Sequence, residues 1–140
     1  MTKKTPAVRS PHEKQIEFRR MAETYKECIK AKYFLAAYVI AFSFLEDRVM
    51  AMDIARPDYV KPRGKEHTAF KVRLGRLEDW LSPELMKHLP LAADERNSLV
   101  HAAMWNLSVF SADNANVIYR LAQKVDAARG RQSRKLKARI

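Results

Sequence analysis

Residues 12–56 contain neither proline nor glycine, and this uninterrupted stretch constrains the fold more than any other feature of the chain. Proline and glycine are the residues that most often end helices, so their absence over such a length predicts helix. One straight helix would exceed about 60 Å at about 1.5 Å per residue, which is long for a small domain. We therefore expect two helices, separated near Lys30, Ala31 and Lys32.

The second of these helices, predicted over about residues 33–55, is apolar on nearly all sides. Its apolar side chains include Phe34, Leu35, Ala36, Val39, Ile40, Phe42, Phe44 and Leu45. A helix without a polar face packs at the centre of a bundle. The apolar run over residues 33–45 is shorter than the roughly 20 residues that a membrane span needs, so we expect a core helix and no membrane partner. The triplet Glu46-Asp47-Arg48 within it requires either charged partners or a solvated edge.

Cap and turn residues divide the rest of the chain. Ser10, Pro11 and Glu13 form a capping box that opens the first helix. The further helices are expected at about residues 67–80, from Ser82-Pro83-Glu84 to Pro90, at about residues 92–106, and from Ser111 or Asp113 to Gly130. The sequence therefore predicts an all-α fold, a helical bundle with basic terminal extensions. Its parts are a basic flexible arm at 1–9, a helical domain at 10–130 and a basic tail at 131–140.

The charge balance points to a polyanionic partner. Lysine and arginine number 27 against 16 acidic residues, which gives a formal charge of +11 and favours RNA, DNA or anionic lipid. The end of the chain concentrates this charge in Arg129, Arg131, Arg134, Lys135, Lys137 and Arg139. These residues would either grip an RNA backbone or form a solvated helix end. The single cysteine, Cys28, excludes an intramolecular disulfide and favours a cytoplasmic protein.

A short segment, Arg96-Asn97-Ser98-Leu99-Val100-His101, combines the side chains that phosphodiester chemistry needs. Arginine presents a fork of donors that fits phosphate, and histidine transfers protons near neutral pH. Asn97 and His101 are four residues apart and share a helix face, whereas Arg96 lies about 140° around the helix from His101. RNA carries its own nucleophile, the 2′-hydroxyl. His101 could deprotonate it or protonate the leaving 5′-oxygen, and Arg96 could stabilise charge on the phosphate.

Each of these residues also has a simpler interpretation. An arginine followed five to seven positions later by a histidine is expected about once by chance here, and an asparagine directly after the arginine lowers this to roughly 0.03. His101 could be a hydrogen-bonded core histidine, and Arg96 could pair with Asp94 or Glu95. Trp80 and Trp105 are expected to be core anchors rather than base-stacking platforms.

Other sites have little support in the sequence. His12, His67 and His88 lie in terminal or loop-like segments and are expected at the surface. No histidine pair has the spacing of metal ligands and no Cys-x-x-Cys occurs, so we expect neither a metal nor a cofactor. The chain also lacks a glycine-rich phosphate loop and a Gly-x-Ser-x-Gly motif, so nucleotide and ester hydrolysis have no motif to support them.

With its asparagine directly after the arginine, the segment from Arg96 to His101 resembles the signature of the HEPN domain. This small all-α domain occurs in many prokaryotic toxins, defence ribonucleases and RNA-processing enzymes. The signature is an arginine, four to six residues and a histidine. The alanine-rich apolar run over residues 33–46, ending in Leu45-Glu46, is similar to the central helix of the family. Residues 81–89 are similar too, and the resemblance covers about residues 12–128.

The resemblance implies a bundle of four to five helices that forms a homodimer, in which two Arg-His motifs face each other across the interface. It implies metal-independent RNA cleavage that leaves a 2′,3′-cyclic phosphate. Arg96 would hold and polarise the phosphate, His101 would transfer the proton, Asn97 would orient the site, and Glu46 would be the polar residue of the central helix nearby. Relatives silenced by adenylylation carry a tyrosine two residues after the histidine, where this chain has Ala103. Inhibition by that route is not expected, and a protein antitoxin of another kind is the inhibitor that the resemblance allows.

Two main functions follow from these observations. The first is a HEPN-type endoribonuclease that acts in toxicity, defence or host conflict. The alternative is a non-catalytic helical module that binds nucleic acid or a protein partner through its basic surface. A third and weaker hypothesis is attachment of the basic ends to anionic lipid at a membrane surface.

Overall fold

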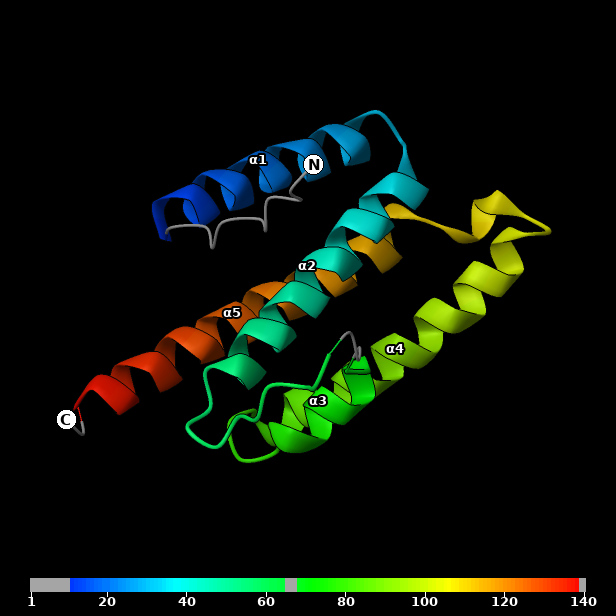
Figure 1. The fold of residues 1–140 in the computed structure, drawn as a ribbon. Coiled ribbons are helices and arrows are strands. Elements are labelled where there is room, and N and C mark those ends of the chain that lie inside the picture. Colours follow the sequence, from blue (N-terminus) through cyan, green and yellow to red (C-terminus); the bar gives the residue numbers. More distant parts are fainter. Residues whose placement is uncertain (1–10, 65–67, 139–140) are drawn as a thin grey trace, which may run out of the picture.

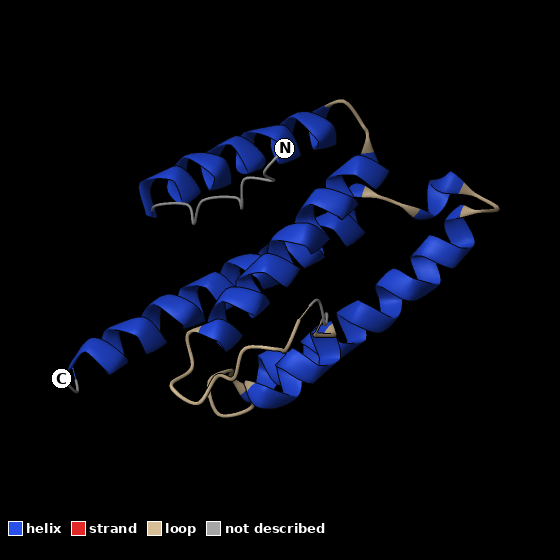
Figure 2. Cartoon of the chain, viewed as in Figure 1, coloured by secondary structure: helices blue, strands red, loops and turns tan. Residues whose placement is uncertain are grey.

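The computed structural model of the chain describes residues 11–64 and 68–138, and all of its regular elements are helical. They are α1 (Pro11–Lys30), α2 (Phe34–Ile54), α3 (Phe70–Arg76), α4 (Pro83–Ala103), the short 3₁₀ helix η1 (Leu107–Val109) and α5 (Ala112–Ala138). Figure 2 shows that loops occupy only short connections, apart from the segment between α2 and α3. The predicted all-α helical bundle is confirmed. The arm predicted at 1–9, the Ser10 cap and His67 lie outside the described residues.

The central element of the bundle is α2. It packs lengthwise against α5, which runs in the same direction, while α1 and α4 run in the opposite direction (Figure 1). The helix α3 packs against both α2 and α4. The buried apolar residues of α2 are Ala37, Tyr38, Ala41, Phe42, Phe44, Leu45, Val49 and Met52. Among the described residues, no helix combines the length and the apolarity that crossing a bilayer requires.

The predicted break after Lys30 is confirmed, and its geometry explains it. The backbone N–H of Tyr33 donates to the carbonyl of Cys28 at 2.8 Å, and that of Lys32 donates to Ile29 at 3.1 Å. These two hydrogen bonds form a Schellman motif, which ends a helix by turning one residue into the left-handed region. Lys32 takes that position with φ of 62°. Glycine is favoured there, so its absence from the sequence hid the exact end of the helix.

The prediction that Pro90 ends a helix is wrong. A single helix, α4, runs from Pro83 to Ala103 with Pro90 inside it. Ser82 caps its start as predicted, because its Oγ accepts a hydrogen bond from the Leu85 N–H at 3.2 Å. The buried residues of α4 lie on both sides of the proline and are Leu85, Leu89, Ala92 and Ala93. Packing of this continuous apolar face offsets the cost of an interior proline, about 3 kcal/mol.

The last helix does not end at Gly130 as predicted. Instead, α5 continues through Gly130 to Ala138, so most of the expected basic tail is helical. An interior glycine costs only about 1 kcal/mol, and good helix formers follow it. Gln132 and Leu136 also line a depression together with Pro57 and Trp80, which gives the extension tertiary support. Conversely, α3 is shorter than its predicted range of 67–80, since it ends at Arg76.

A buried carboxylate connects the end of α2 to α3. Asp53 is fully buried, and its two oxygens accept hydrogen bonds from Arg56 at 3.3 Å, Arg73 at 2.8 Å and Arg76 at 3.2 Å. Arg56 also donates to the backbone carbonyl of Arg76 at 3.0 Å. A carboxylate without solvent needs such partners, and the three guanidinium groups need its charge. The position of α3 therefore depends on Asp53.

We expect Asp53→Asn to lower the free energy of unfolding by about 3 kcal/mol, because three guanidinium groups lose a buried counter-charge. Chemical denaturation followed by circular dichroism measures this change. The matched control is Asp58→Asn, which removes an exposed carboxylate that also pairs with Arg56. That control should cost less than about 1 kcal/mol. Equal effects of the two substitutions would contradict the role of Asp53.

Candidate functional site

Arg96 reaches from α4 to the central helix. Its Nη1 donates to the Glu46 Oε1 at 2.9 Å, and its Cζ lies 4.5 Å from the centroid of the Phe42 ring. The Arg96 and Glu46 side chains are 37% and 40% exposed, so solvent reaches both groups of the pair. The partners considered from the sequence, Asp94 and Glu95, are not the ones it contacts, and Asp94 pairs with Lys71 of α3.

The platform beneath Arg96 is a stripe of α2. Tyr38, Phe42 and Glu46 are spaced four residues apart, which places them on one face of the helix. The Tyr38 and Phe42 rings are buried, with centroids 6.3 Å apart. The guanidinium thus lies over an aromatic face and ends at a carboxylate, and both interactions favour the cation. This arrangement fixes where the charge of Arg96 is presented.

Tyr38 is part of the site that sequence reasoning missed. Its hydroxyl is buried and has no hydrogen-bond partner among the described residues. Burial raises the pKa of Tyr38 to about 12, with a further increase from the negative charge of Glu95 and an opposing effect of Arg96. The phenol therefore lies close to Glu95 and Arg96 and stays neutral at physiological pH. Its spacing from Phe42 and Glu46 was the one sequence signal that could have identified it.

The other two motif residues lie on the exposed surface of α4. Asn97 and His101 are both exposed, and His101 belongs to the last turn of the helix. The alternative of a buried core histidine is therefore wrong. The structure brings Arg96 and Glu46 together, whereas Asn97 and His101 contact solvent one helical turn apart from each other. His12 and His88 are exposed as predicted.

Exposed apolar side chains flank His101 in the sequence. Val100 and Met104 are exposed on either side of it, and the following Trp105 is 90% exposed. The prediction that Trp105 is a core anchor is wrong, because α4 ends at Ala103 and the chain turns before the indole can reach the core. Trp80, in contrast, is half-buried against the core. Val100, Met104 and Trp105 are thus three large apolar side chains exposed within six residues of the chain.

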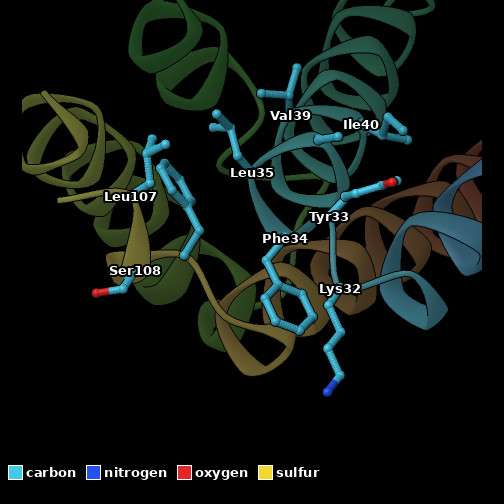
Figure 3. Close-up of a pocket in the computed structure, with 10 residues that line it drawn as sticks. Lys32, Tyr33, Phe34, Leu35, Val39, Ile40, Leu107 and Ser108 are labelled. Atoms are coloured by element: carbon cyan, nitrogen blue, oxygen red, sulfur yellow. The ribbon is translucent and has the colours of Figure 1, made fainter.

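A large apolar groove opens between the start of α2 and η1. Its volume is about 840 Å³, and its walls include Leu35, Val39 and Leu107. Figure 3 shows these side chains around the groove, while the Lys32 ammonium group is directed away from it. The helix α4 leads through Trp105 into η1, so the groove wall at Leu107 follows the exposed Val100, Met104 and Trp105 closely along the chain. We call these residues and Val100, Met104 and Trp105 the apolar patch.

The two other charges of the triplet on α2 are also paired. Arg48 is buried and donates to Asp47 and, across the bundle, to the Asp126 Oδ1 of α5 at 3.1 Å. Its Cζ lies 4.2 Å from the centroid of the Phe18 ring. The interpretation of the triplet as a solvated helix edge holds for the half-exposed Glu46 and Asp47 but not for the buried Arg48. Each of its members forms an ion pair.

The predicted RNA-binding residues lie on α5. Arg131, Arg134, Lys135 and Lys137 are exposed near its end, whereas Arg129 is half-buried beside Asp126. Arg139 lies outside the described residues. Within residues 11–64 and 68–138, no group of three or more histidine, cysteine, aspartate or glutamate side chains has the geometry to hold a metal ion.

Comparison of the chain with protein-family models, with characterised proteins and with solved structures gives no match. The function must therefore be inferred from the residues themselves.

We expect Tyr38→Phe to leave the free energy of unfolding unchanged or to raise it by up to about 1 kcal/mol, because it removes a buried hydroxyl without an acceptor. Tyr38 keeps its proton in the folded state up to about pH 12, but loses it near pH 10 when unfolded. The free energy of unfolding of the unmodified protein should therefore fall as the pH rises between these two values. Tyr38→Phe should remove the contribution of Tyr38 to this fall.

Urea denaturation at pH 7 and pH 11 measures both effects. The matched control is Tyr25→Phe, because the Tyr25 hydroxyl donates to the Asn116 Oδ1. Loss of that hydrogen bond should cost about 1 kcal/mol at pH 7. A loss as large from Tyr38→Phe would contradict the assignment of Tyr38 as unpaired.

Proposed function

We propose that this chain is a metal-independent endoribonuclease of the HEPN type. The observation that carries the proposal is the placement of Arg96 on α4. Its guanidinium is oriented by Glu46 and Phe42, is still half-exposed, and belongs to the same helix as the exposed His101. A cation held for phosphate and a histidine open to solvent are the two groups that cleavage through the 2′-hydroxyl requires.

The proposed reaction uses these groups in defined roles. The 2′-oxygen of RNA forms a bond to phosphorus, the bond from phosphorus to the 5′-oxygen breaks, and a 2′,3′-cyclic phosphate and a 5′-hydroxyl result. His101 accepts the proton of the 2′-hydroxyl or gives one to the 5′-oxygen. Arg96 stabilises the charge that develops on the phosphate oxygens. Asn97 orients the substrate, and Glu46 holds Arg96 in place.

The proposed active form is a homodimer with the two motifs facing each other. One histidine per chain performs one of the two proton transfers, so a second chain supplies the other. The apolar patch next to His101 supports this arrangement, because large exposed apolar surfaces mark interaction sites. Burying Trp105 and Met104 against a second copy would also exclude water near His101.

The exposed cations of α5 form the proposed contact surface for the RNA backbone. Arg131, Arg134, Lys135 and Lys137 would bind phosphates without reading the sequence. We propose a cytoplasmic toxin or defence enzyme, for which a protein antitoxin would be the natural inhibitor.

The second candidate function is a non-catalytic binding module. The Arg96–Glu46 ion pair supports this alternative, because it connects α4 to α2 and so gives the guanidinium a structural role.

We expect His101→Ala to reduce cleavage of single-stranded RNA at least about 100-fold, because the proton-transfer group is lost. The assay contains a chelator and follows a labelled RNA on a denaturing gel. The matched control is His88→Ala, which removes another exposed histidine of α4 and should leave cleavage unchanged. Circular dichroism and light scattering should show the same fold and oligomeric state for both variants.

Undiminished cleavage by the His101→Ala protein would contradict the proposed chemistry. If the unmodified protein binds RNA in a salt-dependent manner without cleaving it, the binding module is correct instead.

A further inference from the structure

A polar pocket lies on the side of α2 that faces away from the Arg96–Glu46 pair. It has a volume of about 370 Å³ and is lined by side chains of α1, α2 and α5, among them Lys14, Gln15, Arg48, Asp126 and Arg129. Arg48 is two residues from Glu46, which corresponds to about 200° around α2. The pocket therefore opens away from the Arg96–Glu46 pair and does not belong to the proposed cleavage site.

The innermost cation of this pocket is rigidly held. The Arg48 side chain is only 4% exposed and is fixed by Asp47, by Asp126 and by the ring of Phe18. Three of its N–H groups donate to these carboxylates. A guanidinium has five N–H donors, so two are left for another acceptor. Because the side chain is already ordered, binding an anion here would cost little conformational entropy.

The second arginine has an unmet hydrogen-bonding need. The Arg129 Nε is buried and has no hydrogen-bond acceptor among the described residues. The Oδ1 of Asp126, with which Arg129 pairs, is 3.8 Å away and already accepts from Arg48. A buried donor without an acceptor is costly. An oxyanion in the pocket would satisfy it.

The charges lining the pocket favour an anion. Lys14, Arg48 and Arg129 contribute three positive charges, against the carboxylate of Asp126 in the lining and that of Asp47, which also pairs with Arg48, so one positive charge is left in excess. Arginine forks match the oxygens of phosphate, and the Gln15 amide adds a neutral donor. The volume is within the usual range for small-molecule sites. We propose that this pocket binds the phosphate group of a small phosphorylated molecule of about nucleotide size.

Calorimetric titration of the full chain at constant ionic strength tests the proposal. The probes are inorganic phosphate, adenosine 5′-monophosphate and, as a ligand without phosphate, adenosine. We expect both phosphate-bearing probes to bind and adenosine not to bind. Tighter binding of the nucleotide would identify a phosphomonoester of that size as the ligand, and equal binding would identify free phosphate.

Variants separate the pocket from the general positive charge of the protein. Arg129→Gln and Lys14→Gln should each weaken phosphate binding at least about tenfold, because each removes a charge-assisted contact. The matched control is Arg120→Gln, which removes one exposed positive charge of the same helix outside the pocket and should change the affinity less than about twofold. Both lining side chains reach solvent, so these substitutions spare the buried Arg48.

Two results would overturn the proposal. One is the absence of binding by both phosphate-bearing probes up to about 10 mM. The other is an equal loss of affinity in Arg120→Gln, which would show attraction to the overall charge rather than a site. The readout is binding and not RNA cleavage, so this test is independent of the proposed ribonuclease activity.

Discussion

The structure depends on one constraint, which is that an apolar helix must be covered on every side and each charge on it must find a partner. The second half of α2 carries four such charges, and three of them reach to different helices. Glu46 pairs with Arg96 of α4, Arg48 with Asp126 of α5, and Asp53 with Arg73 and Arg76 of α3. Apolar burial supplies the bulk of the stabilisation. The ion pairs determine how each neighbouring helix is positioned on α2.

The same constraint explains why the candidate site lies where it does. Asp53 is fully buried and cannot change partners, whereas Glu46 is half-exposed. A half-exposed ion pair contributes about 0–1 kcal/mol, so a phosphate oxygen can replace Glu46 as the partner of Arg96 at little cost. The Phe42 ring continues to hold the guanidinium during such an exchange. An arginine that is oriented but not firmly neutralised is suited to a phosphate that binds and leaves.

Local sequence signals predicted much of the fold but not the contacts between helices. The break after Lys30 and the Ser82 cap depend on neighbouring residues, and both were predictable. The helix ends predicted at Pro90 and Gly130 do not occur. Burial of an apolar face on both sides of Pro90 offsets the cost of that proline, whereas good helix formers and the packing of Gln132 and Leu136 continue α5 past Gly130. This packing exists only in the folded bundle. The exposure of Trp105 follows from the place where α4 ends. The resemblance to the HEPN domain predicted Glu46 as a site residue. Its contact with Arg96 and the unpaired Tyr38 hydroxyl depend on how α2 and α4 meet, which the sequence does not show.

The ends of the RNA produced by the protein test the central claim most directly. A defined single-stranded RNA is incubated with the full chain in the presence of a chelator, and the products are analysed by mass spectrometry. Cleavage through the 2′-hydroxyl predicts fragments that end in a 2′,3′-cyclic phosphate and begin with a 5′-hydroxyl. Fragments with a 3′-hydroxyl and a 5′-phosphate would contradict the roles of His101 and Arg96, because water rather than the 2′-hydroxyl would then be the nucleophile.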